Sequence, residues 1–181
     1  MPFEFQPLAL AGLQVITPKL YPDDRGTFLE SYKKSDFQAA GIPDTFVQDN
    51  LSVSHIGVLR GLHFQKGQHA QAKLVQVLSG IIYDVVVDLR PDSPTYTRWM
   101  GVMLDSKKPQ LLYVPVGFAH GFQVVSDSAI VLYKTSTEYR PEAEGGIVWD
   151  DRDLSITWPL ANPVLSTKDA SLPPFRDFRA F

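Results

Sequence analysis

The chain has 181 residues, of which 44% are hydrophobic, 12% are aromatic and 20% are charged. This composition is typical of a globular protein and excludes a disordered chain, so we expect one domain over residues 1–181. The formal net charge of -3, with no basic run, argues against nucleic acid or a membrane surface as a partner. The absence of cysteine excludes disulfides, thiolate metal ligands and a cysteine nucleophile.

The N-terminal segment lacks the features of a secretion signal. It reads MPFEFQPLALAGLQVITPKL, with an acidic residue and prolines where a signal peptide needs a basic start and an unbroken apolar core. No stretch of about 18 apolar residues occurs in the chain, so we expect no transmembrane segment. Together these features predict a cytoplasmic protein.

In the first half of the chain we expect one helix followed by an extended region. Residues 33–41 (KKSDFQAAG) favour a helix, with Ser35 as its N-cap and Gly41 as its stop. Residues 48–65 (QDNLSVSHIGVLRGLHFQ) are rich in apolar and β-branched residues and are expected to be extended.

In the second half we expect further strands and an irregular end. Residues 73–90 alternate in polarity and predict two strands that turn at residues 79–80. Strands are also expected at 109–115 and 128–139, which are bounded by proline or polar turns. Residues 161–178 are rich in proline and serine, and they form either a loose tail or a lid.

The overall pattern predicts an all-β fold. Fourteen prolines and twelve glycines separate short runs of valine, isoleucine, leucine, tyrosine and phenylalanine, and no alternation of strands with long helices occurs. We therefore expect a jelly-roll β-barrel or sandwich with a few short helices. In such a fold the mouth of the barrel holds the site.

Two short motifs resemble the halves of the cupin motif. GVLRGLHFQ places His63 and Gln65 where cupins usually have two metal-binding histidines, and PVGFAH ends at His120, the position of the later histidine. Gln65 replaces one histidine, and no Glu or Asp occurs between Gln65 and Asp84 to supply the usual carboxylate. We therefore predict a cupin-type jelly roll without a catalytic metal, which disfavours a metal-dependent cupin oxygenase.

A pocket that keeps a histidine without a metal indicates proton transfer. Imidazole ordinarily titrates near neutral pH and is a natural general base, although a single histidine fits a structural role equally well. If strand alternation holds through residues 60–65, His63 and Gln65 point to one face, and Leu62 and Phe64 point to the other. Gln65 or Lys73 would then share the pocket with His63.

Longer blocks of sequence, which occur in order and span nearly the whole chain, carry a closer resemblance. The blocks are DDRGTFLE (23–30), QDNLSVSHIGVLRGLHFQ (48–65), AKLVQVLSGIIYDVVVDLR (72–90), VPVGFAHGFQV (114–124) and YKTSTEYRPEAEGGIVWDD (133–151). They resemble the dTDP-4-dehydrorhamnose 3,5-epimerase family. The stretch KGQHAQAK departs from the family because it lacks an expected proline, which leaves the shape of that loop open.

The resemblance implies a set of catalytic roles. His63 would remove a proton beside the 4-keto group of the sugar, and Asp169 would hold its tautomer. Tyr133 would return a proton to the opposite face, and Lys73 would stabilise the enolate oxygen. His120 would assist the same oxygen or position the ring. Without the resemblance, a strand tyrosine or lysine would be assigned to the core or to a solvated face.

A buried carboxylate and a substrate-binding set complete these expectations. Asp84 lies in an apolar strand, where a charge needs a partner, and we expect it to orient His63, His120 or Lys73. Arg60, with Arg25 and Lys168, would bind the pyrophosphate, because guanidinium groups match phosphate oxygens. The residues expected around the deoxyribose and thymine are Glu30, Gln48, Asp49, Asn50, Glu144, Phe28 and Tyr139.

The resemblance implies a cofactor-free epimerase and a homodimer. The expected reaction inverts carbons 3 and 5 of dTDP-4-dehydro-6-deoxy-D-glucose, with Arg25, Phe28 and Glu30 as candidates to cross into the neighbouring pocket. A mono-epimerase acting on carbon 3 or carbon 5 would present the same His63 and Tyr133. A ketoisomerase is disfavoured because Tyr133 stands at the acid's position. A non-catalytic sugar-nucleotide-binding cupin is disfavoured because base, acid and Asp169 are all present.

Overall fold

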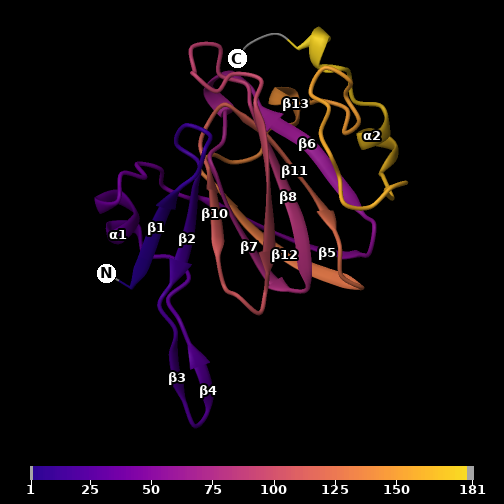
Figure 1. The fold of residues 1–181 in the computed structure, drawn as a ribbon. Helices are drawn as coiled ribbons and strands as arrows, with labels where there is room; N and C mark the ends of the chain where they lie inside the picture. Colours follow the sequence, from indigo (N-terminus) through magenta and orange to yellow (C-terminus); the bar gives the residue numbers. More distant parts are fainter. Residues whose placement is uncertain (1, 179–181) are drawn as a thin grey trace.

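The computed structural model describes residues 2–178, which form two packed antiparallel sheets and a projecting hairpin (Figure 1). The larger sheet has six strands in the order β1 (Phe3–Pro7), β2 (Gln14–Pro18), β10 (Leu111–Val114), β7 (Lys73–Ser79), β12 (Ser128–Thr135) and β5 (Gln48–His55). The smaller sheet has five strands in the order β13 (Glu144–Gly146), β6 (Leu59–Gln65), β11 (Phe118–Val124), β8 (Ile81–Asp88) and β9 (Trp99–Asp105). The predicted all-β jelly roll is confirmed.

The remaining elements are short. The hairpin consists of β3 (Tyr21–Asp23) and β4 (Gly26–Phe28). The helical elements are α1 (Lys34–Ala39), α2 (Thr167–Ala170) and the single turns η1 (Gly67–His69), η2 (Pro141–Ala143) and η3 (Phe175–Asp177). Within residues 2–178, no helix is long and apolar enough to cross a membrane.

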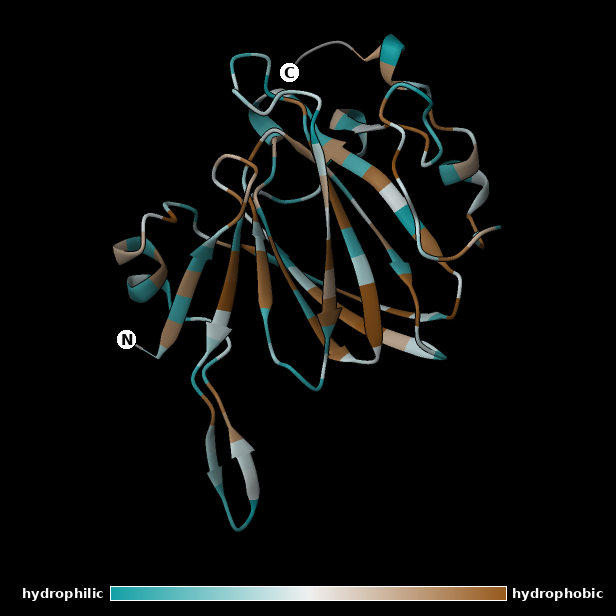
Figure 2. Ribbon diagram, in the orientation of Figure 1, coloured by the Kyte–Doolittle hydropathy of each residue, from teal (hydrophilic) through white to brown (hydrophobic). Residues whose placement is uncertain are grey.

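Inward-facing side chains divide the space between the sheets into an apolar part and a polar part. Along β7, the residues that face inward are Lys73, Val75 and Val77, because side chains of a strand alternate between its faces. Val75 and Val77 pack in a buried core with Val86 of β8, and hydrophobic residues alternate with hydrophilic ones along several strands in Figure 2. Lys73 lies beyond this core, so the polar end begins where the apolar packing stops.

The strand predictions are confirmed with shorter bounds. Residues 73–90 form β7 and β8, which are joined at Ser79 and Gly80. Residues 109–115 and 128–139 contain β10 and β12, but β12 ends at Thr135 and the chain then runs towards the pocket. Residues 48–65 are extended as β5 and β6, which a short turn places in different sheets.

Helix α1 covers the outer face of the larger sheet near β1 and β2. Its only fully buried side chain, Phe37, packs against Phe3 with the rings edge to face. The helix ends before Gly41, as predicted, but Ser35 is not its N-cap. The helix begins at Lys34, so Ser35 lies inside the first turn and its hydroxyl contacts a carboxylate rather than a backbone N–H.

The C-terminal segment covers the outer face of the smaller sheet. Phe175 and Phe178 pack against the buried cluster that contains Leu62 and Phe64 of β6. Val164 is tied to the start of β6, because its N–H donates to the carbonyl of Gly57 at 2.9 Å. The loose-tail alternative is therefore wrong for residues 161–178, which pack along β6 and bring α2 to the pocket (Figure 1).

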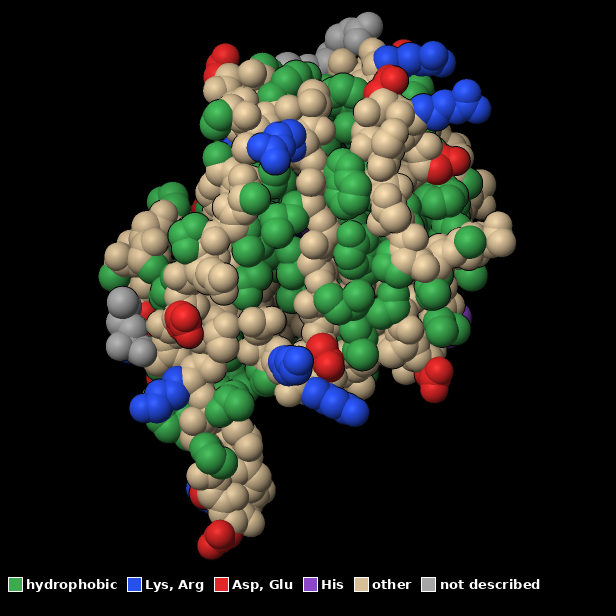
Figure 3. Space-filling view, in the orientation of Figure 1, with side chains coloured by type: hydrophobic (Ala, Val, Ile, Leu, Met, Phe, Trp, Pro, Cys, Tyr) green, Lys and Arg blue, Asp and Glu red, His purple; other side chains and the backbone are tan. Residues whose placement is uncertain are grey.

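The β3–β4 hairpin stands away from the sandwich, and in the space-filling view it forms an arm clear of the body (Figure 3). Asp23 and Arg25 form an exposed ion pair at its tip. Phe28 is 66% exposed, although its ring lies 6.3 Å from that of Tyr21. The arm therefore presents an aromatic pair and an arginine outside the body of its own chain.

Candidate active site

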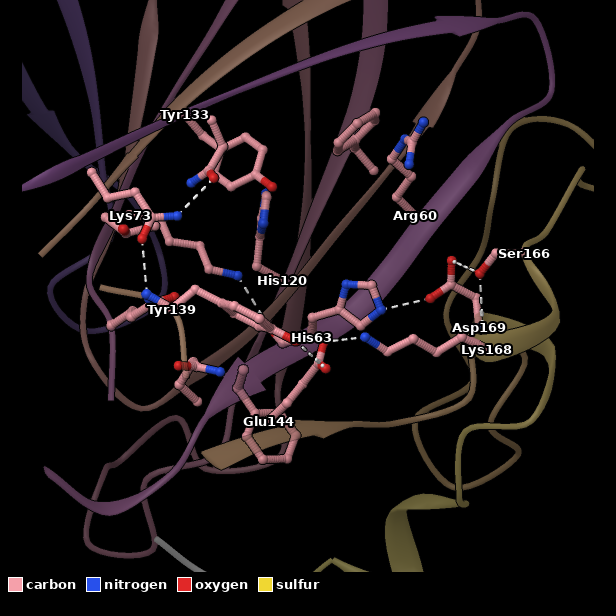
Figure 4. Close-up of a pocket in the computed structure, with 17 residues that line it drawn as sticks. Arg60, His63, Lys73, His120, Tyr133, Tyr139, Glu144, Ser166, Lys168 and Asp169 are labelled. Atoms are coloured by element: carbon pink, nitrogen blue, oxygen red, sulfur yellow. Dashed lines mark hydrogen bonds and ion pairs between the residues drawn. The ribbon is translucent and has the colours of Figure 1, made fainter. Parts of the chain in front are cut away.

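A pocket of about 370 Å³ opens at the polar end of the sandwich (Figure 4). Both sheets line it, and α2 closes one side of its mouth. Most of the residues that the sequence predicts for the site are among its lining residues. They are Gln48, Asn50, Arg60, His63, Lys73, His120, Tyr133, Tyr139, Glu144, Lys168 and Asp169.

A β-bulge in β6 places Arg60 and His63 in the same pocket. His63 pairs with His120 of β11, whereas Arg60 pairs with Phe122. The two paired positions are three residues apart on β6 but only two apart on β11, so β6 contains one extra residue. The extra residue breaks the alternation that was expected through residues 60–65 and turns Arg60 to the side of His63. Gly61 lies in this irregular stretch with a φ of +129°.

His63 and Asp169 form a hydrogen-bonded pair. His63 Nε2 lies 2.5 Å from Asp169 Oδ1, and Asp169 is only 4% exposed. Burial raises the pKa of Asp169, but hydrogen bonds from His63 and Ser166 outweigh burial and bring the pKa below its usual value. An ionised carboxylate only accepts hydrogen bonds, so Nε2 carries the proton. Nδ1, which has no hydrogen bond within residues 2–178, then keeps a free lone pair.

Tyr133 lies on the facing sheet. It comes from β12 of the six-stranded sheet, whereas His63 comes from β6 of the five-stranded sheet. Burial raises the pKa of Tyr133, and the charge of Arg60 opposes this effect only partly. The phenol therefore stays protonated at neutral pH and can act as an acid across the pocket from His63.

Lys73 is a buried cation beside His63. It is 7% exposed, and its Nζ donates to the backbone carbonyl of His63 at 3.3 Å. Burial lowers the pKa of Lys73 to about 8, although the carboxylates of Asp84 and Glu144 favour its charged form. A charge that is buried in this way interacts strongly with negative charge that develops in the pocket.

His120 and Asp84 form a second buried pair. The atoms His120 Nε2 and Asp84 Oδ2 are 2.9 Å apart, and Asp84 is fully buried. Burial lowers the pKa of His120, and the neighbouring Asp84 opposes this shift. Of the three partners expected for Asp84, the one that it contacts by a hydrogen bond is His120. The neutral imidazole of His120 is therefore held in a fixed orientation in the wall of the pocket.

Three side chains form a network at the mouth. Lys168 Nζ donates to Glu144 Oε1 at 2.5 Å, and the Tyr139 hydroxyl donates to Glu144 Oε2 at 2.8 Å. Burial raises the pKa of Glu144, but the two donated hydrogen bonds outweigh burial and lower it. The same network raises the pKa of Lys168 and of Tyr139, chiefly through their hydrogen bonds to Glu144. The network links α2 to β13 and to the segment after β12.

Gln65 has a structural function at the position where cupins place a metal ligand. Its amide donates to the carbonyl of Arg140 at 2.9 Å and accepts from the N–H of Arg140 at 2.8 Å. It shares the pocket wall with Lys73, so both of the residues that were expected beside His63 are present. Among residues 2–178, no three His, Cys, Asp or Glu side chains are grouped so that they could hold a metal ion.

Four predicted site residues do not line this pocket. Asp49 lies between Gln48 and Asn50 on β5 and therefore points to the opposite face, where it pairs with Lys134. The other three lie on or beside the projecting hairpin, along its own groove, and are Arg25, Phe28 and Glu30.

The pocket also contains residues that were absent from the predicted site. Thr135 and Gln71 bond to the backbone of Thr137 and shape the wall, and Phe122 lines the pocket from β11. Ser166 caps α2 and contacts Asp169. Only Ser166 has a sequence signal, because a serine three residues before an acidic residue is typical of a helix N-terminus.

Comparisons with known proteins agree with this geometry. The family model for dTDP-4-dehydrorhamnose 3,5-epimerase matches residues 7–177. A relative of that name from Methanothermobacter thermautotrophicus is 46% identical over 178 residues, covering 97% of this chain and 96% of the relative. The crystal structure of the enzyme from Elizabethkingia anophelis NUHP1 superposes with a TM-score of 0.93 at 43% identity, covering 98% of each chain.

A second structure is a dTDP-6-deoxy-D-glucose-3,5-epimerase from Legionella pneumophila in complex with dTDP-4-keto-L-rhamnose. It has a TM-score of 0.93 and 44% identity, covering 98% of this chain and 95% of that one. The resemblance carried by the ordered sequence blocks is therefore confirmed, as is the cupin-type jelly roll. The chain belongs to the dTDP-4-dehydrorhamnose 3,5-epimerase family.

Proposed function

We propose that the chain inverts carbons 3 and 5 of dTDP-4-dehydro-6-deoxy-D-glucose and releases dTDP-4-dehydro-L-rhamnose. The names of its relatives and the ligand of the Legionella structure support this substrate. The observation that carries the proposal is the position of His63, paired with Asp169, opposite Tyr133 on the facing sheet. A proton can thus leave one face of the sugar ring and return to the other.

The first step is removal of a proton next to the 4-keto group. The carbonyl makes the hydrogens on carbons 3 and 5 acidic, because the resulting carbanion is conjugated as an enolate. His63 Nδ1 accepts the proton, and Asp169 stabilises the imidazolium that forms. The inversions at both carbons use the same enolate oxygen. One base and one acid serve each in turn, because solvent takes the proton from His63 and returns one to Tyr133 before the ring turns over for the second inversion.

The enolate needs a positive partner, and Lys73 supplies it. Its ammonium group is buried and fixed by the carbonyl of His63, so it needs no rearrangement as charge develops on the oxygen. His120, fixed by Asp84, supports the same region of the sugar. Tyr133 completes the inversion by giving its proton to the face opposite His63.

The nucleotide binds at the outer part of the pocket. Arg60 and Lys168 neutralise the pyrophosphate, and Arg60 is held by a hydrogen bond from its Nε to Ser54 Oγ at 3.1 Å. Lys168 changes its partner from Glu144 to phosphate when the nucleotide binds. The residues that contact the deoxyribose and the base are Gln48, Asn50, Tyr139 and Glu144.

We also propose a homodimer in which the β3–β4 hairpin reaches the neighbouring pocket. The outer face of β5 supports this assembly, since Leu51 is 60% and Val53 is 64% exposed on an edge strand. Arg25 of the partner subunit would add a third cation to the pyrophosphate site, beside Phe28 of the partner subunit and Glu30 of the partner subunit. Sedimentation of the chain and of a Leu51→Asp variant tests the dimer. A wild-type monomer at micromolar concentration would contradict it.

Deuterium incorporation tests the reaction directly. The protein is incubated with the substrate in deuterated water with a chelator, and deuterium at carbons 3 and 5 is read by NMR. Label at both carbons, with the L-configured product trapped by a reductase, is the expected result. Label at one carbon would indicate a mono-epimerase. No label, with intact dTDP binding, would indicate a binding protein.

A further inference from the structure

Ser166 makes two hydrogen bonds to the residue that holds the catalytic histidine. Its Oγ accepts from the backbone N–H of Asp169 at 3.0 Å and lies 2.9 Å from Asp169 Oδ2. The carboxylate can only accept, so the hydroxyl proton of Ser166 must point to Oδ2. The other carboxylate oxygen, Oδ1, bonds to His63. Both oxygens of a buried carboxylate therefore have a defined donor.

The arrangement fixes the direction of the carboxylate. Asp169 belongs to a helix of four residues, which has little stability of its own. The tie from Val164 to β6 fixes the chain before the helix, and Ser166 then connects the N-cap to the side chain of Asp169. Rotation of the carboxylate away from His63 would break two hydrogen bonds at once.

We infer that Ser166 is a positioning residue for proton transfer, because its hydroxyl aims the carboxylate of Asp169 at His63. Ser166 acts through Asp169 and is not itself the base or the acid. This inference rests on the proposed function, since proton removal by His63 is the step that depends on the carboxylate. The low pKa of Asp169 agrees with a hydrogen bond donated by Ser166. Of the two side-chain hydrogen bonds that lower this pKa, the one from His63 has the larger effect and the one from Ser166 the smaller.

Three substitutions separate positioning from simple helix capping. Ser166→Ala removes both the cap and the hydroxyl. Ser166→Gly also removes the hydroxyl, but glycine is a tolerated N-cap and leaves the helix nearly as stable. Ser166→Thr keeps the hydroxyl. Thr167→Ala is the matched control, because Thr167 is exposed and its side chain has no hydrogen bond within residues 2–178.

We expect the rate to fall in the variants that lack the hydroxyl, whether or not the new residue is a good N-cap. Ser166→Ala and Ser166→Gly should slow deuterium incorporation by roughly ten-fold, the value of one charge-assisted hydrogen bond converted to a rate. Ser166→Thr and Thr167→Ala should retain most of the rate, and dTDP affinity measured by calorimetry should be unchanged in all four. If Ser166→Gly reacted at the wild-type rate, Ser166 would serve only as the N-cap of the helix, and the inference would be overturned.

A second measurement tests the role of Ser166 in the absence of substrate. The proton between His63 Nε2 and Asp169 should give a downfield NMR signal that is missing in His63→Asn. This signal should move upfield in Ser166→Ala and Ser166→Gly and stay in Ser166→Thr. No signal in the wild type, or no movement in Ser166→Ala, would overturn the role of Ser166. If the wild type shows the signal but incorporates no deuterium, the proposed function fails and the positioning role stands.

Discussion

His63 and Tyr133 line one pocket from two different sheets, with His63 on β6 and Tyr133 on β12. This separation predicts different effects of removing each group. His63→Ala should abolish deuterium incorporation, with a loss of roughly 100- to 10,000-fold, because His63 is the group that accepts the proton in the proposed reaction. Tyr133→Phe should still incorporate deuterium, but the proton should return to the wrong face, so that exchange exceeds epimerisation.

The two variants are compared by NMR of the labelled sugar and by reductase trapping of the L-product. Both variants should bind dTDP with wild-type affinity, since neither group contacts the pyrophosphate in the proposed complex. Equal and complete loss of exchange in both variants would contradict the assignment of His63 as base and Tyr133 as acid.

The lowered pKa of Lys73 predicts that activity declines at mildly alkaline pH. Its pKa is lowered to about 8 by burial, and the charged ammonium is the form that stabilises an enolate. As the pH rises through about 8, the fraction of charged Lys73 falls and kcat should fall with it. Tyr133 does not cause this decline, because its pKa is raised. The measurement is kcat as a function of pH.

Two variants test the assignment of that decline. Lys73→Met should lower kcat by roughly 100-fold, which is typical for loss of one donor to a developing oxyanion. Lys73→Arg keeps its charge to much higher pH, so its residual activity should show no fall near pH 8. Lys107→Met, at an exposed position outside the pocket, is the control. An unchanged alkaline fall in Lys73→Arg would assign it to another group.

The proposed contact of Arg60 with the pyrophosphate predicts that replacing Arg60 weakens nucleotide binding. Arg60→Ala should weaken dTDP binding by roughly ten- to a hundred-fold, the range for a hydrogen bond to a charged group. Exchange at saturating substrate should change much less, because the guanidinium lies outside the reacting carbons in the proposed complex. Calorimetry with dTDP measures the effect, and exposed Arg152→Ala is the control. Unchanged affinity would exclude Arg60 from the pyrophosphate site.

Strand alternation predicts part of the site and the ordered sequence blocks predict more. Alternation along β7 correctly places Lys73 on the inward face with Val75 and Val77. The same rule, applied to β5, would have turned Asp49 outward. The pairing of His63 with Asp169 spans 106 positions, so no local pattern can reveal it and only the family resemblance indicated it.

Tertiary geometry decides what the sequence leaves open. Arg60 and His63 share a pocket because of a bulge, and a pattern with a period of two assigns them to opposite faces. The network of Lys168, Glu144 and Tyr139 joins segments that meet only after the sandwich has formed. Ser35 satisfies the composition of an N-cap, but the N-cap is Lys33, two residues earlier.

The position of Gly61 in the β6 bulge, between Arg60 and His63, predicts that the stability of the folded protein depends on the absence of a side chain there. A Cβ at Gly61 would lie 2.5 Å from Gly121 Cα, and its φ of +129° is strained for any other residue. Gly61→Ala should therefore lower the free energy of unfolding by about 3 kcal/mol. Gly67→Ala is the matched control, because its φ is +58° but no atom lies within 4 Å of the added Cβ, and it should cost only about 1 kcal/mol. Urea unfolding measures both, and equal losses would show that strand packing at Gly121 tolerates a side chain.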